Sequence, residues 1–218
     1  MNSEQQHIID QVAHDVHERM SGDSSHDWWH IFRVWNMAKR LCEIEKADGF
    51  VVELGALLHD IADWKFHDGD ETVGPKVARE ILESHGVVSD VIDHVCEIIA
   101  TISFKGAGVA TPMRTLEGKI VQDADRLDAI GAIGIARTFA YGGDKDRAMY
   151  NPDRPHALHQ NKDDYFRDDG ATINHFYEKL LLLKDRMNTN AAKELAEQRH
   201  QFMETYLQEF FSEWEGKK

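Results

Sequence analysis

Three short polar segments interrupt apolar, helix-like stretches of the chain and carry the residue types of a metal site. They are His30, the adjacent pair His59 and Asp60, and the distant Asp125. Imidazole nitrogens and carboxylate oxygens together bind divalent ions and leave coordination positions for water. Titratable side chains beside a buried face also need a partner, which an ion provides. The set therefore predicts metal-assisted hydrolysis.

Amphipathic helices are predicted around all of these residues, because apolar side chains recur there at helical spacing. The helices that carry them are predicted over 27–46, over 51–63 and from Thr115 through Asp125. Further helices are predicted over 4–20, 74–86, 89–99, 173–183 and 191–214. No alternating pattern of useful length indicates a strand, so the fold class is expected to be all-α.

Length and composition favour one soluble domain over residues 1–218. The chain has 42% hydrophobic and 29% charged residues, which is ordinary for a globular protein. No apolar run approaches the roughly 18 residues of a membrane span, and no secretory signal begins the chain. The segment 141–170 lacks helical periodicity and is expected to be a loop or lid before the C-terminal helices at 171–214.

Charge and cysteine content indicate which classes of binding partner and which cellular compartment are compatible with the sequence. The formal net charge of −14 argues against duplex nucleic acid, which requires a basic surface. A small anionic substrate stays compatible with it, because a metal ion can reverse the local potential. Cys42 and Cys96 lie in apolar helical patterns and are expected to be buried reduced thiols, as in cytoplasmic proteins.

The order and the flanks of the three segments resemble the HD-domain phosphohydrolase superfamily, whose signature is H…HD…D on a helical bundle. The matching flanks are Arg33-Val34 after the first histidine, the apolar run 57–61 around His59-Asp60, and Asp-Ala-Asp-Arg-Leu-Asp-Ala-Ile-Gly over 123–131. The resemblance covers about residues 20–140, and beyond them the chain is similar to a short stand-alone bacterial branch. It implies an HD-type bundle with additional C-terminal helices.

The resemblance also implies that His30, His59, Asp60 and Asp125 bind one divalent ion. The mixture of imidazole and carboxylate favours Mn2+, with Mg2+, Co2+, Ni2+, Fe2+ or Zn2+ as alternatives. Asp63 follows His59 by one helical turn, where family members often place an acid, and is a candidate proton acceptor. Asp128 is the alternative catalytic acid, or it hydrogen-bonds a metal-ligating histidine.

Cations near such a site would bind a phosphorylated substrate, because charge neutralisation dominates phosphoryl transfer. The candidates are Arg33, Lys65, Lys105 and Arg126. The bacterial branch implies a nucleotide substrate, with a (deoxy)nucleoside triphosphate cleaved to monophosphate and pyrophosphate. A nucleoside monophosphatase and a cyclic-nucleotide phosphodiesterase are alternatives, and a non-catalytic, metal-containing nucleotide-binding module is a rival of another class. A monomer or a homodimer is expected.

The start of the helix predicted over 27–46 allows two interpretations of its polar and aromatic residues. Asp27 is expected either to cap the helix or to hydrogen-bond a metal ligand. Trp28, Trp29 and Trp35 are expected to anchor the core, with stacking on a base as the alternative for one of them.

Overall fold

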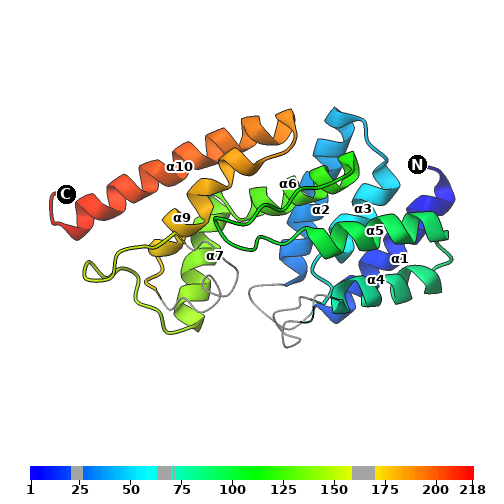
Figure 1. Ribbon diagram of the computed structural model, residues 1–218, viewed down its shortest axis with the longest axis horizontal. Helices are drawn as coiled ribbons and strands as arrows, with labels where there is room; N and C mark the ends of the chain where they lie inside the picture. The colour runs from blue at the N-terminus through cyan, green and yellow to red at the C-terminus, as the bar shows by residue number, and fades with distance from the viewer. Residues whose placement is uncertain (21–26, 63–69, 71, 159–169) are drawn as a thin grey trace. The chain divides into compact units, whose positions relative to one another are not determined.

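The computed structural model describes residues 1–20, 27–62, 70, 72–158 and 170–218 (Figure 1). Two compact units make up the chain: Met1–Phe104 with Thr111–Asp125, and Lys105–Ala110 with Arg126–Lys218. Every regular element in the described ranges is a helix, which confirms the all-α fold class. None of these helices is long and apolar enough to cross a membrane. The single domain over 1–218 stays a prediction.

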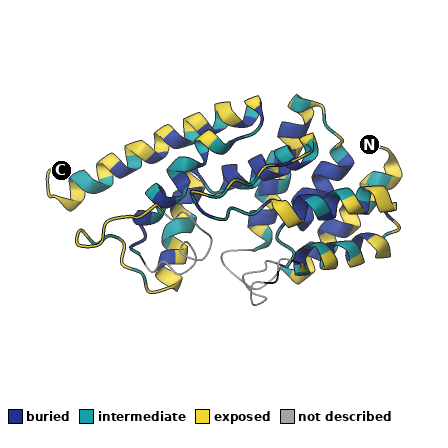
Figure 2. Ribbon diagram, viewed as in Figure 1, coloured by how far each residue is buried: buried dark blue, intermediate teal, exposed yellow. Residues whose placement is uncertain are grey.

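The first unit is built around one buried helix, α3 (Gly49–Leu58). It packs against α1 (Ser3–Arg19), α2 (Trp28–Glu45) and α5 (Ser89–Thr101), while α4 (Val73–Ser84) packs on α5. All residues of α3 from Phe50 to Leu58 are buried, whereas α1, α2, α4 and α5 each keep an exposed face (Figure 2). The end of α3 therefore delivers its last residues into the interior of the unit.

Side-chain caps set where the helices of the first unit begin. Asn2 and Gln5 form a reciprocal capping box at the start of α1. Asp27 accepts a hydrogen bond from the backbone N–H of His30 at 2.9 Å, so it is the N-cap of α2, one of its two predicted roles. Asp48 accepts from Phe50 N at the start of α3. These caps place His30 in the first turn of α2.

Helix α6 (Leu116–Asp128) approaches α3 closely through a glycine. A Cβ atom on Gly55 would lie 3.2 Å from Cγ2 of Val121, which is tighter than ordinary van der Waals contact. Thr115 accepts a hydrogen bond from Gly118 N and caps α6. Val121 and Asp125 are four residues apart and share a helix face. The missing side chain at Gly55 therefore lets α6 bring Asp125 toward the end of α3.

The second unit contains two elements that differ from the sequence-based expectation. Helix α7 (Gly131–Asp144) continues into the segment 141–170, so the first residues of the predicted loop are helical. The predicted helix over 173–183 is wrong as a continuous element. It is divided into α9 (Asn174–Glu178) and the 3-10 helices η2 (Leu180–Leu182) and η3 (Lys184–Arg186), because Lys179 leaves the helical backbone region at φ −140°.

An aromatic cluster surrounds Phe176, a fully buried core residue of the second unit. The long helix α10 (Asn190–Trp214) packs against α7 and η3. Phe176 is fully buried and stacks on Tyr206 with ring centroids 5.9 Å apart, and Phe139 of α7 contacts both rings. The helices between residues 174 and 186 are short and irregular. Burial of the Phe176 ring stabilises this segment in place of a long regular helix.

The two cysteines are buried free thiols, as predicted. Burial raises the pKa of Cys42 and of Cys96, because a thiolate is poorly solvated in an apolar environment. We expect both thiols to react slowly with iodoacetamide in the folded protein at pH 8 and at the rate of free cysteine in 6 M guanidinium chloride. Mass spectrometry of peptides labelled over time measures this. Rapid native labelling of either residue would contradict the buried environment.

Candidate metal centre

His30 enters the site from the buried side of the first turn of α2. Its side chain is 2% exposed, and its neighbours Ile31 and Val34 are fully buried. The Asp27 cap fixes the backbone of this turn, so the imidazole position is set by both the cap and the core. A rigid support of this kind favours a preorganised ligand.

His59 and Asp60 lie immediately after the last residue of α3. His59 continues the helical backbone at φ −59° and ψ −31°, and its Nδ1 lies 2.8 Å from the carbonyl oxygen of Ala56. A carbonyl oxygen only accepts, so Nδ1 carries the hydrogen and donates it. In the neutral imidazole, Nε2 then has a free lone pair. The backbone of α3 thereby selects the tautomer that binds a metal through Nε2.

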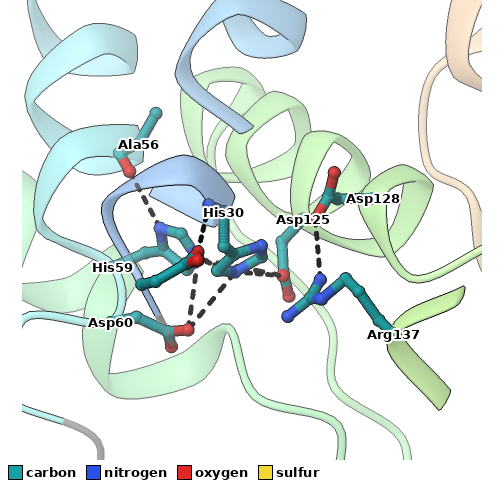
Figure 3. Close-up of polar contacts among 8 residues, drawn as sticks. His30, Ala56, His59, Asp60, Asp125, Asp128 and Arg137 are labelled. Atoms are coloured by element: carbon teal, nitrogen blue, oxygen red, sulfur yellow. Dashed lines mark hydrogen bonds and ion pairs between the residues drawn. The ribbon is translucent and has the colours of Figure 1, made fainter. Parts of the chain in front are cut away.

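The four predicted ligands converge in the first unit (Figure 3). His30 Nε2 lies 3.2 Å from His59 Nε2, 3.3 Å from Asp60 Oδ2 and 3.6 Å from Asp125 Oδ1. His59 Nε2 lies 3.7 Å and 3.8 Å from the same two carboxylate oxygens. Donor atoms about 2.1 Å from one ion lie roughly 3 to 3.5 Å apart when adjacent. The spacing therefore fits a common ion after small shifts.

The chemistry of the donor set also fits a divalent ion. His30, His59 and Asp60 offer ligand atoms that all lie within 4.8 Å of one another, and Asp125 approaches both imidazoles. The imidazole side chains are 2% and 1% exposed, whereas Asp60 is 18% and Asp125 33% exposed. Solvent thus reaches the centre past the carboxylates, where water and a substrate oxygen can enter.

Of the two candidate catalytic acids, the structure describes only Asp128. Asp63 lies outside the described residues. Asp128, in the second unit, is 5% exposed and accepts a hydrogen bond from Arg137 Nη1 at 2.7 Å (Figure 3). The structure thus shows an ion pair for Asp128, and its catalytic role stays a prediction.

The four candidate phosphate-binding cations lie in different surroundings. Arg33 is half-buried on α2, one turn after His30, and Lys65 lies outside the described residues. Lys105 begins the loop 105–110 of the second unit. Arg126 is buried, and its guanidinium donates to the carbonyl oxygen of Arg186. This contact gives Arg126 a structural partner, while the substrate role of all four cations stays a prediction.

Arg186 organises the loop that contains Lys105, a role that was not predicted from the sequence. Its guanidinium donates to the carbonyl oxygens of Gly106, Ala107 and Val109. Burial lowers the pKa of Arg186, because the charged form loses hydration. Three carbonyls on one planar fork hold the loop in a single conformation. Nothing in the local sequence around residue 186 indicates a partner eighty residues away.

A buried hydrogen bond joins the two helices that supply the histidines. Trp35 Nε1 on α2 donates to Glu53 Oε2 on α3 at 2.8 Å, and Glu53 is only 5% exposed. Trp35 was expected to anchor the core, whereas the role of Glu53 was not predicted from the sequence. A glutamate within the apolar run 50–58 was the available signal, because such a residue needs a buried partner. The bond fixes α2 relative to α3.

We expect Trp35→Phe to destabilise the protein by about 2 kcal/mol and to weaken metal binding. The phenyl ring preserves much of the packing but leaves the Glu53 carboxylate without its indole donor. Chemical denaturation and manganese titration measure the two effects. Adding Glu53→Gln to Trp35→Phe is the matched control and should restore part of the stability, because a neutral amide is less costly to bury. Unchanged stability in Trp35→Phe would contradict the role given to this bond.

Comparison with known proteins places this helical chain in a recognised family. A family model described as "HD domain" matches residues 28–130. The Bacillus subtilis protein YpgQ is 43% identical over 189 residues, which cover 85% of this chain and 83% of YpgQ. The chain belongs to the HD superfamily. HD domains bind divalent metals, so membership supports a metal-dependent phosphohydrolase in general.

Two solved structures extend the similarity over nearly the whole chain. An HD-superfamily hydrolase from Bacillus thuringiensis is 46% identical with a TM-score of 0.76, covering 97% of this chain and 98% of its own. The crystal structure of B. subtilis YpgQ in complex with ADP is 37% identical with a TM-score of 0.78, covering 96% of each chain.

Proposed function

We propose that the protein hydrolyses nucleotides, most specifically (deoxy)nucleoside triphosphates to a monophosphate and pyrophosphate. The observation that carries the proposal is the convergence of His30 Nε2, His59 Nε2, Asp60 and Asp125 on one position. The nucleotide class is supported by the relative YpgQ, whose crystal structure has been solved in complex with ADP. Manganese is the proposed ion, because it accepts both imidazole and carboxylate ligands.

His30, His59, Asp60 and Asp125 would hold the ion, which supplies charge neutralisation at phosphorus and a lowered pKa for water. The α-phosphorus–oxygen bond to the β-phosphate breaks as water oxygen bonds to the α-phosphorus. Asp63 or Asp128 accepts the proton that the water loses. Arg33 is the proposed phosphate contact on α2, and Lys65, Lys105 and Arg126 are further candidates. Substrate would reach the ion from the side of Asp60 and Asp125, because these two side chains are partly exposed to solvent.

The test is a product-resolved assay of purified protein with manganese and a panel of nucleotides. We expect equal amounts of nucleoside monophosphate and pyrophosphate from triphosphates, with no orthophosphate. Orthophosphate from monophosphates would instead indicate a phosphatase, and cleavage of cyclic nucleotides without free phosphate a phosphodiesterase. Tight nucleotide binding with metal present and no turnover with any divalent ion would indicate a binding module.

A further inference from the structure

The first turn of α2 exposes large aromatic side chains beside a buried metal ligand. Trp29 is 61% exposed and Phe32 39% exposed, whereas His30 between them is 2% exposed. The two rings meet edge to face with centroids 6.0 Å apart, and Phe32 also contacts Trp28 at 6.1 Å. Large aromatic surfaces are usually buried, so an exposed tryptophan held by ring contacts needs another explanation than core packing.

These rings share a helix face with a candidate phosphate contact. Trp29 and Arg33 are four residues apart and are therefore neighbours on the surface of α2. Trp29 directly precedes His30, so the two residues are about 1.5 Å apart along the helix axis. One rigid helix thus presents a metal ligand, a guanidinium and an exposed aromatic ring within its first two turns.

The size of the exposed pair favours a small planar ligand over a protein. A large aromatic side chain has roughly 150–250 Å² of surface, so Trp29 and Phe32 together expose about 200 Å². A stable protein interface buries about 800 Å² on each partner. The next strongly exposed apolar residue of α2, Ile44, lies about 22 Å from Trp29 along the axis. The exposed aromatic patch is therefore confined to the first two turns of α2, which also carry His30.

We infer that Trp29, supported by Phe32, is the stacking surface for the base of a nucleotide whose phosphates bind at the His30 centre. The inference rests on the proposed nucleotide function and extends it to a base subsite. Every base offers a π-face, so a stacking surface tolerates different bases. The predicted preference is therefore for nucleotides over phosphates that lack a base, rather than for one base.

The experiment compares two probes that differ by the nucleoside: ADP and inorganic pyrophosphate, each titrated calorimetrically in the presence of manganese. Trp29→Ala should weaken ADP binding by about 5-fold to 150-fold and change pyrophosphate binding by less than twofold. Phe32→Ala should have a smaller effect of the same kind, and Trp29→Phe should recover part of the affinity. Ile44→Ala, an exposed apolar residue on the same helix, should change neither titration.

Several results would overturn the inference. They are unchanged ADP affinity in Trp29→Ala, equal weakening of ADP and pyrophosphate, and no ADP binding by the unsubstituted protein. Loss of a homodimer in Trp29→Ala with ADP affinity intact would assign the patch to a second copy instead. The proposed hydrolysis is separable: ADP binding that depends on Trp29 without nucleotide turnover would keep the base subsite and reject the hydrolase.

Discussion

Asp125→Ala is expected to reduce hydrolysis by about 10³-fold or more and to abolish stoichiometric metal binding. The variant removes the carboxylate that approaches both imidazoles, 3.6 Å from His30 Nε2 and 3.8 Å from His59 Nε2. An ion supplies several kcal/mol of transition-state stabilisation in phosphate hydrolysis, and each 1.4 kcal/mol is about tenfold in rate. Elemental analysis and a steady-state assay with manganese measure both losses.

The same substitution should leave the metal-free fold intact. Asp125 is one-third exposed, and its removal relieves repulsion between the Asp125 and Asp60 carboxylates in the absence of an ion. We therefore expect the metal-free variant to melt at or above the midpoint of the metal-free parent. Asp10→Ala is the matched control, because Asp10 is an exposed aspartate of α1 whose carboxylate accepts a hydrogen bond from the neighbouring Gln6 side chain. Retained turnover in Asp125→Ala would refute the ligand assignment.

Arg137→Ala is expected to destabilise the protein by about 3 kcal/mol. Its guanidinium donates to Asp128 at 2.7 Å, and removing one partner of a buried ion pair takes away charge compensation that the buried carboxylate needs. Arg137 itself is 29% exposed, so the loss should fall at the lower end of the range for buried pairs. For a chain of this length, the thermal midpoint should drop by roughly 6–12 °C. Calorimetry at pH 7 measures the change.

The double variant Asp128→Ala with Arg137→Ala is the control for this pair. It should be more stable than Arg137→Ala alone, because the buried carboxylate that lost the Arg137 charge is gone as well. Equal stability of the two would mean that the pair contributes nothing.

Asp128→Asn separates a structural role from a catalytic one. If Asp128 serves the ion pair, the thermal midpoint falls while the acidic limb of the kcat–pH profile is kept. If it accepts the proton in hydrolysis, kcat falls and that limb disappears. We expect the first result, because the carboxylate is 5% exposed and already bound to Arg137. The proton acceptor would then be Asp63.

Helical periodicity was sufficient to predict most elements of the first unit. The helices expected over 27–46 and 89–99 correspond to α2 and α5, because each buries one regular apolar stripe. The prediction of a helix failed where the apolar spacing of the sequence and the tertiary packing favour different structures. The regular apolar spacing over 173–183 favoured one helix, but the ring contacts of Phe176 and the turn at Lys179 divide it.

The sequence by itself determined the chemical identity of the centre: two imidazoles, two carboxylates and their order along the chain. Only the tertiary structure decided that their donor atoms approach within 3.2–3.8 Å of His30 and His59 Nε2. That proximity depends on the close contact at Gly55 and on the Ala56 carbonyl that orients His59. The physical reason is that periodicity reports which side of a helix is buried, whereas the distance between helices depends on the side chains that meet.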